Sequence, residues 1–312
     1  MNIRQNEISE LLFTTDAHYS DPFNEAELDV IFTAPDGLVR KIPAFWAGGR
    51  TWKARYSSGL IGTHSYLSQS PDKAMDGITG TVDVTPYSGE NLLYAHGPIR
   101  REKENMYLAY DDGMPFFWLA DTCWMGLTKR LPLPGGFEEL VADRVSKGFN
   151  VMQIVAGLYP DMPPFDRRGA NGAGFPWDAE YHCVNPAFFD EADKKIFYLT
   201  ENSIVPCIVG SWGFHMGFAG IENLKRHWRY IIARWAAYPV VWCVAGEANL
   251  PYYTDPNISP EEFLKKSRAD WSEVARYIRD TDPFARLVTI HPTENGHEQV
   301  DDESLLVKEY KL

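Results

Sequence analysis

The stretch V-V-W-C-V-A-G-E-A-N-L-P, residues 240–251, carries a short apolar run directly into a glycine, a carboxylate and an amide. A continuously apolar run of this length is typical of a strand buried on both faces, as in a parallel sheet covered by helices. Acidic side chains are almost never fully buried without a partner. Glu247 therefore marks the point where a buried strand reaches the edge of the fold.

Similar short apolar runs recur along the C-terminal two thirds of the chain. Amphipathic helical patterns separate the apolar runs, and one of them opens with S-P-E-E at 259–262, which predicts a capped helix start. Alternating strands and helices predict a parallel sheet, and about 40 residues per unit favours a TIM-type (β/α) barrel. The other predicted strands are 115–120, 151–156, 204–210 and 286–290.

The length of this region raises a question about the barrel. A complete (β/α)₈ barrel takes about 250 residues, whereas about 200 follow residue 105 and five units are visible. Either three further units are short, or the chain ends inside the barrel. We favour the second interpretation and expect a barrel that is incomplete at its C-terminal side.

Residues 1–104 have a different pattern. Short runs of β-forming residues alternate with turn sequences such as A-P-D-G at 34–37 and A-G-G-R at 47–50, and no helical period is visible. This pattern predicts an all-β sandwich. We therefore expect two domains, a β-sandwich over 1–104 and a (β/α)-barrel domain over 105–312.

The overall composition limits the kinds of partner that the chain is expected to bind. The net charge of −13 disfavours a nucleic-acid partner, which needs clustered Lys and Arg. Aromatic residues make up 14% of the chain, with ten Trp, which fits either large cores or a sugar-binding cleft. The four Cys show no C-x-x-C spacing, so they indicate free, packed thiols rather than a zinc site.

The sequence shows neither a signal peptide nor a membrane-spanning segment. Its N-terminus lacks the apolar core of a signal peptide, and no run approaches the ~18 apolar residues of a membrane span. As written, the chain is expected to be cytoplasmic. It would be secreted or periplasmic if its N-terminus is a processed or partial form.

Parallel barrels place their active sites at the C-terminal ends of the strands. Glu247 stands at such an end, followed by Asn249 and by the loop aromatics Tyr252 and Tyr253. A carboxyl group walled by aromatic side chains is desolvated and can serve as a general acid in glycoside hydrolysis, opposed by a second carboxylate. The alternative is structural, with Glu247 paired to an arginine or capping its loop.

Other strand ends supply further candidates for a sugar site. Trp124 and Trp212 could stack on sugar rings or belong to the core. Asp121 could bind hydroxyls or hold neighbouring strands together, and Glu294 and His297 are weaker candidates. A metal site is disfavoured, because the histidines follow different strands without H-x-x-x-H spacing. The candidate substrate-binding residues are Asp121, Trp124, Trp212, His215, Asn249 and His291.

Several stretches resemble a known family. The sequences P-F-F-W-L-A-D-T-C-W (115–124), K-G-F-N-V-M-Q-I (147–154) and V-V-W-C-V-A-G-E (240–247) resemble the apiosidase-like glycoside hydrolase barrels, long catalogued as a domain of unknown function. F-W-A-G-G-R-T-W-K-A-R-Y-S (45–57) resembles the β-sandwich that often precedes such barrels. The resemblance implies a (β/α)₈ catalytic domain that acts on plant or microbial polysaccharide side chains or oligosaccharides through a two-carboxylate mechanism.

This chain departs from the family pattern at the strand-four acid, and no residue here matches the second carboxylate of the family. The strand-four acid of the characterised members is an Asp after Gly-Gly, whereas this chain has Glu247 after Ala-Gly. The longer side chain is nearer the strand-four Glu of broader barrel glycosidases and leaves the substrate open. The partner carboxylate of such barrels lies on a late strand, and no residue here matches that position, so we assign no nucleophile.

These observations favour a glycoside hydrolase with Glu247 as acid/base and no cofactor. A non-catalytic carbohydrate-binding protein, or an inactive fragment of a glycosidase, is the alternative that the unassigned second carboxylate supports. A lyase acting on acidic polysaccharide is a weaker third possibility, because no Lys/Arg cluster marks the expected cleft. The sugar, the linkage and the oligomeric state are left open by the sequence.

Overall fold

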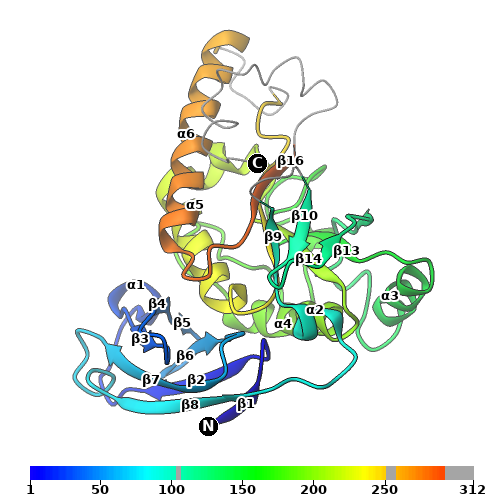
Figure 1. Cartoon of the computed structure of the whole chain (residues 1–312). Coiled ribbons are helices and arrows are strands. Elements are labelled where there is room, and N and C mark those ends of the chain that lie inside the picture. The colour runs from blue at the N-terminus through cyan, green and yellow to red at the C-terminus, as the bar shows by residue number, and fades with distance from the viewer. Residues whose placement is uncertain (103–106, 251–257, 292–312) are drawn as a thin grey trace.

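The computed structural model describes residues 1–102, 107–250 and 258–291 (Figure 1). Tyr252, Tyr253, Glu294 and His297 lie outside the described residues. The chain runs from strands that pair in antiparallel sheets into alternating parallel strands and helices, which is the order that the sequence predicted.

The N-terminal part contains two sheets. The larger has the order β1-β8-β7-β3-β4 and is antiparallel except for the parallel pair β1–β8, and the smaller has the order β2-β6-β5. Buried and outward positions alternate along β2 and β3, as expected for half-buried strands. Phe32 of β3 stacks on Tyr56 of β6 with ring centroids 3.9 Å apart, so the two sheets pack face to face. The strands are β1 (Asn2–Arg4), β2 (Ser9–Thr14), β3 (Asp29–Thr33), β4 (Val39–Pro43), β5 (Phe45–Trp46), β6 (Thr51–Tyr56), β7 (Gly62–Gln69) and β8 (Thr79–Thr85).

The C-terminal part is built on a five-stranded parallel sheet with the order β12-β13-β14-β15-β16. A small antiparallel sheet, β11-β10-β9, precedes it in the chain. The parallel strands are β12 (Ala120–Thr122), β13 (Val151–Val155), β14 (Val205–Val209), β15 (Val241–Gly246) and β16 (Val288–His291), and the small sheet contains β9 (Ile99–Arg101), β10 (Leu108–Tyr110) and β11 (Pro115–Phe116).

The first parallel strand does not lie where the sequence predicted it. The expected strand at 115–120 divides into two pieces, because Pro115 and Phe116 pair with β10 in the small antiparallel sheet. Parallel pairing with β13 begins only at Ala120. The prediction was therefore wrong by about one strand length, and Asp121 lies inside β12 rather than after it. The other four parallel strands agree with the predicted ranges to within two residues.

Helices cover one face of the parallel sheet. Met152, Ile208 and Trp242 point to this face and pack in one cluster with buried residues of α3 to α6. The predicted capping box at Ser259 is present, with its hydroxyl accepting from the backbone N–H of Glu262. The helices are α1 (Pro22–Glu25), α2 (Leu92–His96), α3 (Gly136–Ser146), α4 (Pro186–Glu201), α5 (His215–Trp235, broken at Gly220) and α6 (Pro260–Thr281), with a short 3₁₀ turn at Arg167–Gly169.

The opposite face of the parallel sheet forms a second cluster. Val151, Cys207 and Cys243 lie on this face, together with buried residues of α2 and of the small sheet such as Leu93 and Phe116. Cys123, Cys207 and Cys243 are buried free thiols, and Cys183 is partly buried. The predicted role of cysteine as a packed hydrophobe is confirmed for the three buried residues.

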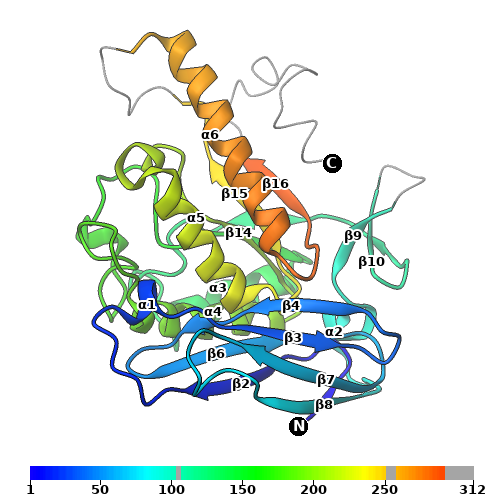
Figure 2. The same cartoon turned by 90° about the vertical axis from the view of Figure 1, so that its left-hand side faces the viewer.

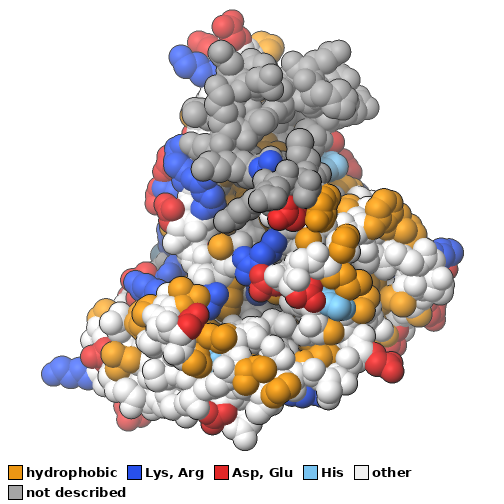
Figure 3. All heavy atoms as spheres, in the orientation of Figure 1, with side chains coloured by type: hydrophobic (Ala, Val, Ile, Leu, Met, Phe, Trp, Pro, Cys, Tyr) orange, Lys and Arg blue, Asp and Glu red, His pale blue; other side chains and the backbone are white. Residues whose placement is uncertain are grey.

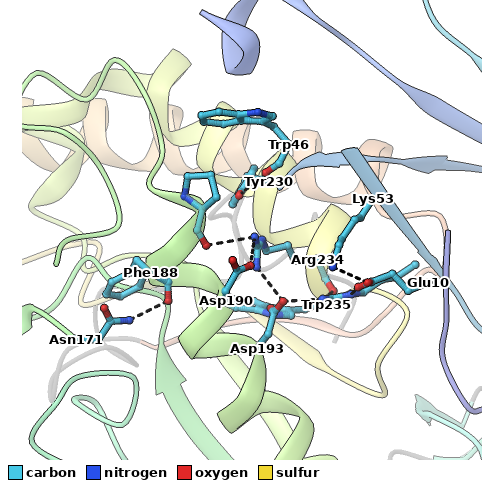
Figure 4. A network of polar contacts seen from close by, with 12 residues as sticks. Glu10, Trp46, Lys53, Asn171, Phe188, Asp190, Asp193, Tyr230, Arg234 and Trp235 are labelled. Atoms are coloured by element: carbon cyan, nitrogen blue, oxygen red, sulfur yellow. Dashed lines mark hydrogen bonds and ion pairs between the residues drawn. The ribbon is translucent and has the colours of Figure 1, made fainter. Parts of the chain in front are cut away.

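A buried ionic network joins the N-terminal sheets to α4 and α5 (Figure 4). Arg55 of β6 donates to Asp193 of α4 at 2.6 Å, and Arg234 of α5 donates to the same carboxylate oxygen at 2.8 Å. The indole of Trp235 donates to the other oxygen of Asp193 at 2.7 Å. Burial by itself would raise the pKa of Asp193, but the two guanidinium groups more than offset it and hold that pKa below its ordinary value.

The two parts of the chain share one hydrophobic cluster, which runs from the N-terminal sheets into the helices. Figure 2 shows the N-terminal sheets beneath α4 and α5, with α6 rising beside β15 and β16. On the face drawn in Figure 3, Lys and Arg side chains gather along the α6 side, while acidic side chains are spread over several elements. In Figure 1, β16 ends on the side away from the N-terminal sheets.

Candidate active site

The candidate site begins where β15 ends. The pairing of β15 with β16 shifts register between Cys243 and Gly246, which is a local irregularity of the kind that re-aims a side chain. Glu247 then adopts a left-handed backbone conformation with φ 48°, and its N–H donates to the carbonyl oxygen of His291 at 2.8 Å. Non-glycine residues in this conformation are uncommon and are often found at functional sites.

Three rings from three different strand ends meet beside this carboxylate. We call Trp124, Trp212 and His291 the ring cluster; they follow β12, follow β14 and end β16, respectively. The ring centroids are 5.1 Å apart for the two tryptophans, 5.2 Å for Trp124 and His291, and 5.5 Å for Trp212 and His291. The indole Nε1 of Trp212 donates to Oε2 of Glu247 at 3.1 Å. The cluster therefore holds the carboxylate against an aromatic wall.

Two glycines let the chain pack this tightly. A Cβ on Gly246 would lie 2.2 Å from Cε3 of Trp212, and a Cβ on Gly213 would lie 2.7 Å from Cα of Ala248. Gly213 also donates its N–H to the carbonyl oxygen of Gly246 at 2.7 Å. The absence of both side chains allows the indole of Trp212 to lie directly on the end of β15.

The charge state of His291 follows from its position. Desolvation lowers the pKa of this imidazole, and the nearby Glu247 carboxylate opposes the shift only in part. His291 is therefore neutral at pH 7, with one ring nitrogen as donor and the other as acceptor. A neutral imidazole beside a half-buried carboxylate can bind a hydroxyl group without adding a charge.

Three buried polar atoms near the same sheet edge have no hydrogen-bond partner within the described part of the chain. They are the hydroxyls of Tyr159 and Ser211 and Oδ1 of Asn249, and they follow β13, β14 and β15. Most buried polar atoms in folded proteins are paired, so each exception needs an explanation. Ordered water or a bound polar ligand would supply the missing partners.

The structure brings together four of the seven residues that the sequence proposed for the site. Glu247, Trp124, Trp212 and His291 form one constellation. Asn249 lies two residues beyond Glu247 and is buried, with Oδ1 unpaired in the described structure. The proximity of the four residues in the constellation depends on the parallel register of the sheet.

Asp121 does not join the ring cluster. It pairs in register with Met152, whose side chain packs on the helix-covered face of the sheet. Its carboxylate forms an ion pair with Arg144 of α3 and accepts the N–H of Thr122 at 2.8 Å. Its in-strand position turns Asp121 away from the ring cluster and makes it a strand-to-helix contact, and its binding of sugar hydroxyls stays a prediction.

His215 is also placed differently from our expectation. Its side chain is buried, with Nε2 3.0 Å from the carbonyl oxygen of Tyr159 and Nδ1 3.5 Å from the hydroxyl of Tyr181. Burial lowers the pKa of His215 to about 4, so the imidazole is neutral. It begins α5 as a packed residue outside the ring cluster, and its role in sugar binding stays a prediction.

Tyr159 and Ser211 were not among the residues that the sequence analysis proposed. Both follow predicted strands, so their positions were accessible to the same argument as Trp212. Their unpaired hydroxyls could not be anticipated, because that property depends on which neighbours the fold supplies.

Among the described residues, no cluster of His, Cys, Asp or Glu has the arrangement of a metal site.

The described helices include none that is long and apolar enough to cross a membrane.

Comparison with known proteins shows the family. Residues 102–307 match the model described as "Apiosidase-like, catalytic domain", and residues 2–71 match a domain of unknown function, DUF5060. No curated protein matches the chain.

Two solved structures share the fold. One, from Bacteroides vulgatus ATCC 8482, is described as a "putative glycoside hydrolase"; it aligns with 94% of this chain and 56% of its own length, with a TM-score of 0.72 and 22% identity. A glycoside hydrolase family 5 structure from the same organism aligns with 66% of this chain and 42% of its own length, with a TM-score of 0.50 and 20% identity. The chain thus spans about half the length of these structures. By its match over residues 102–307, the chain belongs to the apiosidase-like catalytic-domain family.

Proposed function

We propose that this chain is a glycoside hydrolase that acts on plant or microbial polysaccharide or oligosaccharide, with Glu247 as the acid/base of a two-carboxylate mechanism. The observation that supports this most directly is the hydrogen bond from Trp212 to Glu247 beside Trp124 and His291. We further propose that residues 1–104 form a β-sandwich domain and residues 105–312 a (β/α)-barrel domain, which the five parallel strands support.

We assign a task to each side chain of the site. Protonated Glu247 would donate its proton to the glycosidic oxygen as the bond to the leaving group breaks, and as a carboxylate it would later take a proton from water. Trp212 fixes the carboxylate through its N–H, and the faces of Trp124 and Trp212 would pack against sugar C–H groups. His291 and Asn249 would bind hydroxyls.

The second carboxylate of the proposed mechanism is not assigned. In glycosidases it faces the acid across about 5–5.5 Å when the enzyme retains the anomeric configuration and about 6.5–9.5 Å when it inverts it. The resemblance implies that this group lies on a late strand, and no described residue matches that position, so we name no nucleophile.

The test is a screen of hydrolysis on 4-nitrophenyl glycosides and plant polysaccharides, followed by Glu247→Gln. General acid–base catalysis contributes about 10²–10⁴-fold, so we expect kcat on the substrate found to fall by about that factor while calorimetric binding is largely kept. Glu222→Gln, which makes the same chemical change at an exposed site on α5, is the matched control and should keep full activity.

Two results would contradict the proposal. Near-normal turnover by Glu247→Gln would remove Glu247 from the mechanism. Glycan binding by the wild-type chain without any hydrolysis would instead support the carbohydrate-binding alternative, in which the ring cluster holds a sugar and performs no chemistry.

A further inference from the structure

A hollow of about 160 Å³ is lined by residues of α1, of the N-terminal sheets and of α5, and Glu247 is not among them. Its volume is close to the ~150 Å³ cavity that admits a benzene ring in a well-studied case. A six-membered ring is therefore the scale of ligand that it fits. The lining residues that bear on a ligand are Phe23, Asn24, Trp46, Arg226, Arg229 and Tyr230.

Aromatic side chains form much of the apolar lining, beside Ala26, Leu28 and Ala44, and contacts hold several of them in place. Trp46 of β5 is half-buried, and its indole donates to the carbonyl oxygen of Gly49 at 3.0 Å. The Tyr230 hydroxyl donates to the carbonyl oxygen of Trp46 at 2.8 Å, and Figure 4 shows the two residues close together. Phe23 packs edge-on against Tyr230 with centroids 5.8 Å apart. Such fixed aromatic surfaces bind flat apolar faces at low entropic cost.

The polar part of the lining comes mainly from one face of α5. Arg226, Arg229 and Tyr230 stand at i, i+3 and i+4 and so lie on the same side of the helix. Arg229 is already engaged by carboxylates, at 3.0 Å from Asp29 and 3.7 Å from Glu27.

Arg226 differs from Arg229 in its partner. Its guanidinium donates to Oδ1 of Asn24, a neutral acceptor, and within the described residues it forms no ion pair. The amide of Asn24 is in turn committed to Asp21 and to the carbonyl oxygen of His182, at 2.7 and 3.0 Å. The lining therefore offers a guanidinium whose charge is not matched by a carboxylate, beside fixed aromatic rings.

We propose that this hollow is a second carbohydrate-binding site, which takes one uronic acid unit of a glycan. The guanidinium of Arg226 would bind the sugar carboxylate, since Arg forms strong, directional hydrogen bonds with carboxylates. The apolar face of the sugar ring would lie against Trp46 and Phe23. The site uses none of the ring cluster and does not depend on the role of Glu247.

The test measures binding by calorimetry to the Glu247→Gln chain, so that turnover cannot interfere. The probes are tri-galacturonate and the neutral xylotriose. We expect tri-galacturonate to bind at least tenfold more tightly than xylotriose, and we expect Arg226→Gln to weaken tri-galacturonate binding at least tenfold. Trp46→Ala should weaken it by a similar factor.

Matched variants keep the outcome interpretable. Arg130→Gln and Phe117→Ala change an exposed arginine and an exposed aromatic residue that do not line the hollow, and both should bind like the parent. Trp46 is half-buried, so circular dichroism must show that Trp46→Ala is folded. If Trp46→Ala does not fold, Arg226→Gln still decides the question, because Arg226 is exposed.

Three results would overturn the inference: no binding of tri-galacturonate, equal binding of xylotriose, or undiminished binding by Arg226→Gln. A failure of the proposed hydrolase function would look different, because it would show in the turnover of the chain and of Glu247→Gln. Arg226→Gln in the wild-type background should hydrolyse a small aryl glycoside at the parent rate.

Discussion

The indole N–H of Trp212 and the carboxylate of Glu247 meet at 3.1 Å, although the two residues follow different strands of the parallel sheet. The contact is possible because Trp212 lies on Gly246, the last residue of β15. It gives the half-buried carboxylate a charge-assisted hydrogen bond and a fixed orientation. The ring that would touch a sugar is thus the same ring that positions the proposed acid/base.

Replacing Trp212 with Phe separates these two tasks. The change keeps a large aromatic ring but removes the donor to Glu247. Hydrogen bonds to charged groups are worth about 1.5–3 kcal/mol, so we expect kcat to fall about tenfold or more while KM changes little. Steady-state kinetics on the substrate identified by the glycoside screen check this. An unchanged kcat would show that the hydrogen bond does not contribute to turnover.

Gly246→Ala tests the packing beneath the same ring. The new Cβ would lie 2.2 Å from Cε3 of Trp212, so the indole or the strand must shift. Overpacking of this kind typically costs about 1–3 kcal/mol, and we expect a lower urea midpoint together with loss of activity. Gly217→Ala is the control, because its Cβ would meet nothing within 4 Å. Equal stability of the two variants would contradict the close packing.

Asn249→Ala tests the unpaired amide oxygen. Oδ1 accepts no hydrogen bond within the described structure, so we expect the variant to lose substrate contacts more than stability. One neutral hydrogen bond contributes about 0.5–1.5 kcal/mol, which corresponds to a rise in KM of roughly 2- to 10-fold. Asn202→Ala, on the far end of α4, should leave KM unchanged. A large fall in the unfolding midpoint with an unchanged KM would assign Asn249 to the fold alone.

Asp193→Asn tests the network that holds the N-terminal sheets against α4 and α5. The change leaves the buried guanidinium groups of Arg55 and Arg234 without their shared carboxylate. Breaking a buried ion pair from one side costs about 3–5 kcal/mol, measurable by urea denaturation. Asp190→Asn is the control, because Asp190 binds the same Arg234 from a largely exposed position and should cost ~1 kcal/mol or less. Similar losses for both variants would rule out burial as the cause.

Two buried histidines predict a loss of stability in mild acid. Burial lowers the pKa of both His215 and His227 to about 4, below the ordinary value near 6.5. Protonation therefore favours the unfolded chain, so their contribution is complete above about pH 6.5 and is lost as the pH falls towards 4. The Nδ1 of His227 already accepts the indole N–H of Trp177 at 3.1 Å, which leaves no lone pair for a second proton.

Urea denaturation between pH 7.5 and pH 5 measures this effect. We expect the free energy of unfolding to fall across that range, and His227→Gln should make the fall shallower because one of the histidines with a lowered pKa is gone. A variant with the same pH dependence as the parent would show that His227 does not carry the effect. The Asp193 carboxylate does not interfere with this measurement. Its pKa is already lowered, so it titrates below pH 5.

The strands and helices around the site follow from local patterns in the sequence. Apolar runs at 151–156, 204–210 and 240–245 form strands, because a parallel sheet covered on both faces buries the side chains of such a run. The start of α6 was equally predictable, since the capping box at Ser259 uses residues only three apart. The strand-end position of Glu247 follows from the same reasoning, because the period of the pattern breaks at Gly246.

The tertiary structure decided which strand-end residues share a site. Asp121 and Trp124 are three residues apart, yet one contacts α3 and the other joins the ring cluster, because β12 starts at Ala120 and fixes which face each residue takes. His215 follows Trp212 by three residues but turns into the core at the start of α5. The hollow beside Arg226 exists only because the N-terminal sheets pack on α5. Sequence fixes local conformation through neighbouring residues, whereas contacts between distant segments depend on register and packing that no local pattern contains.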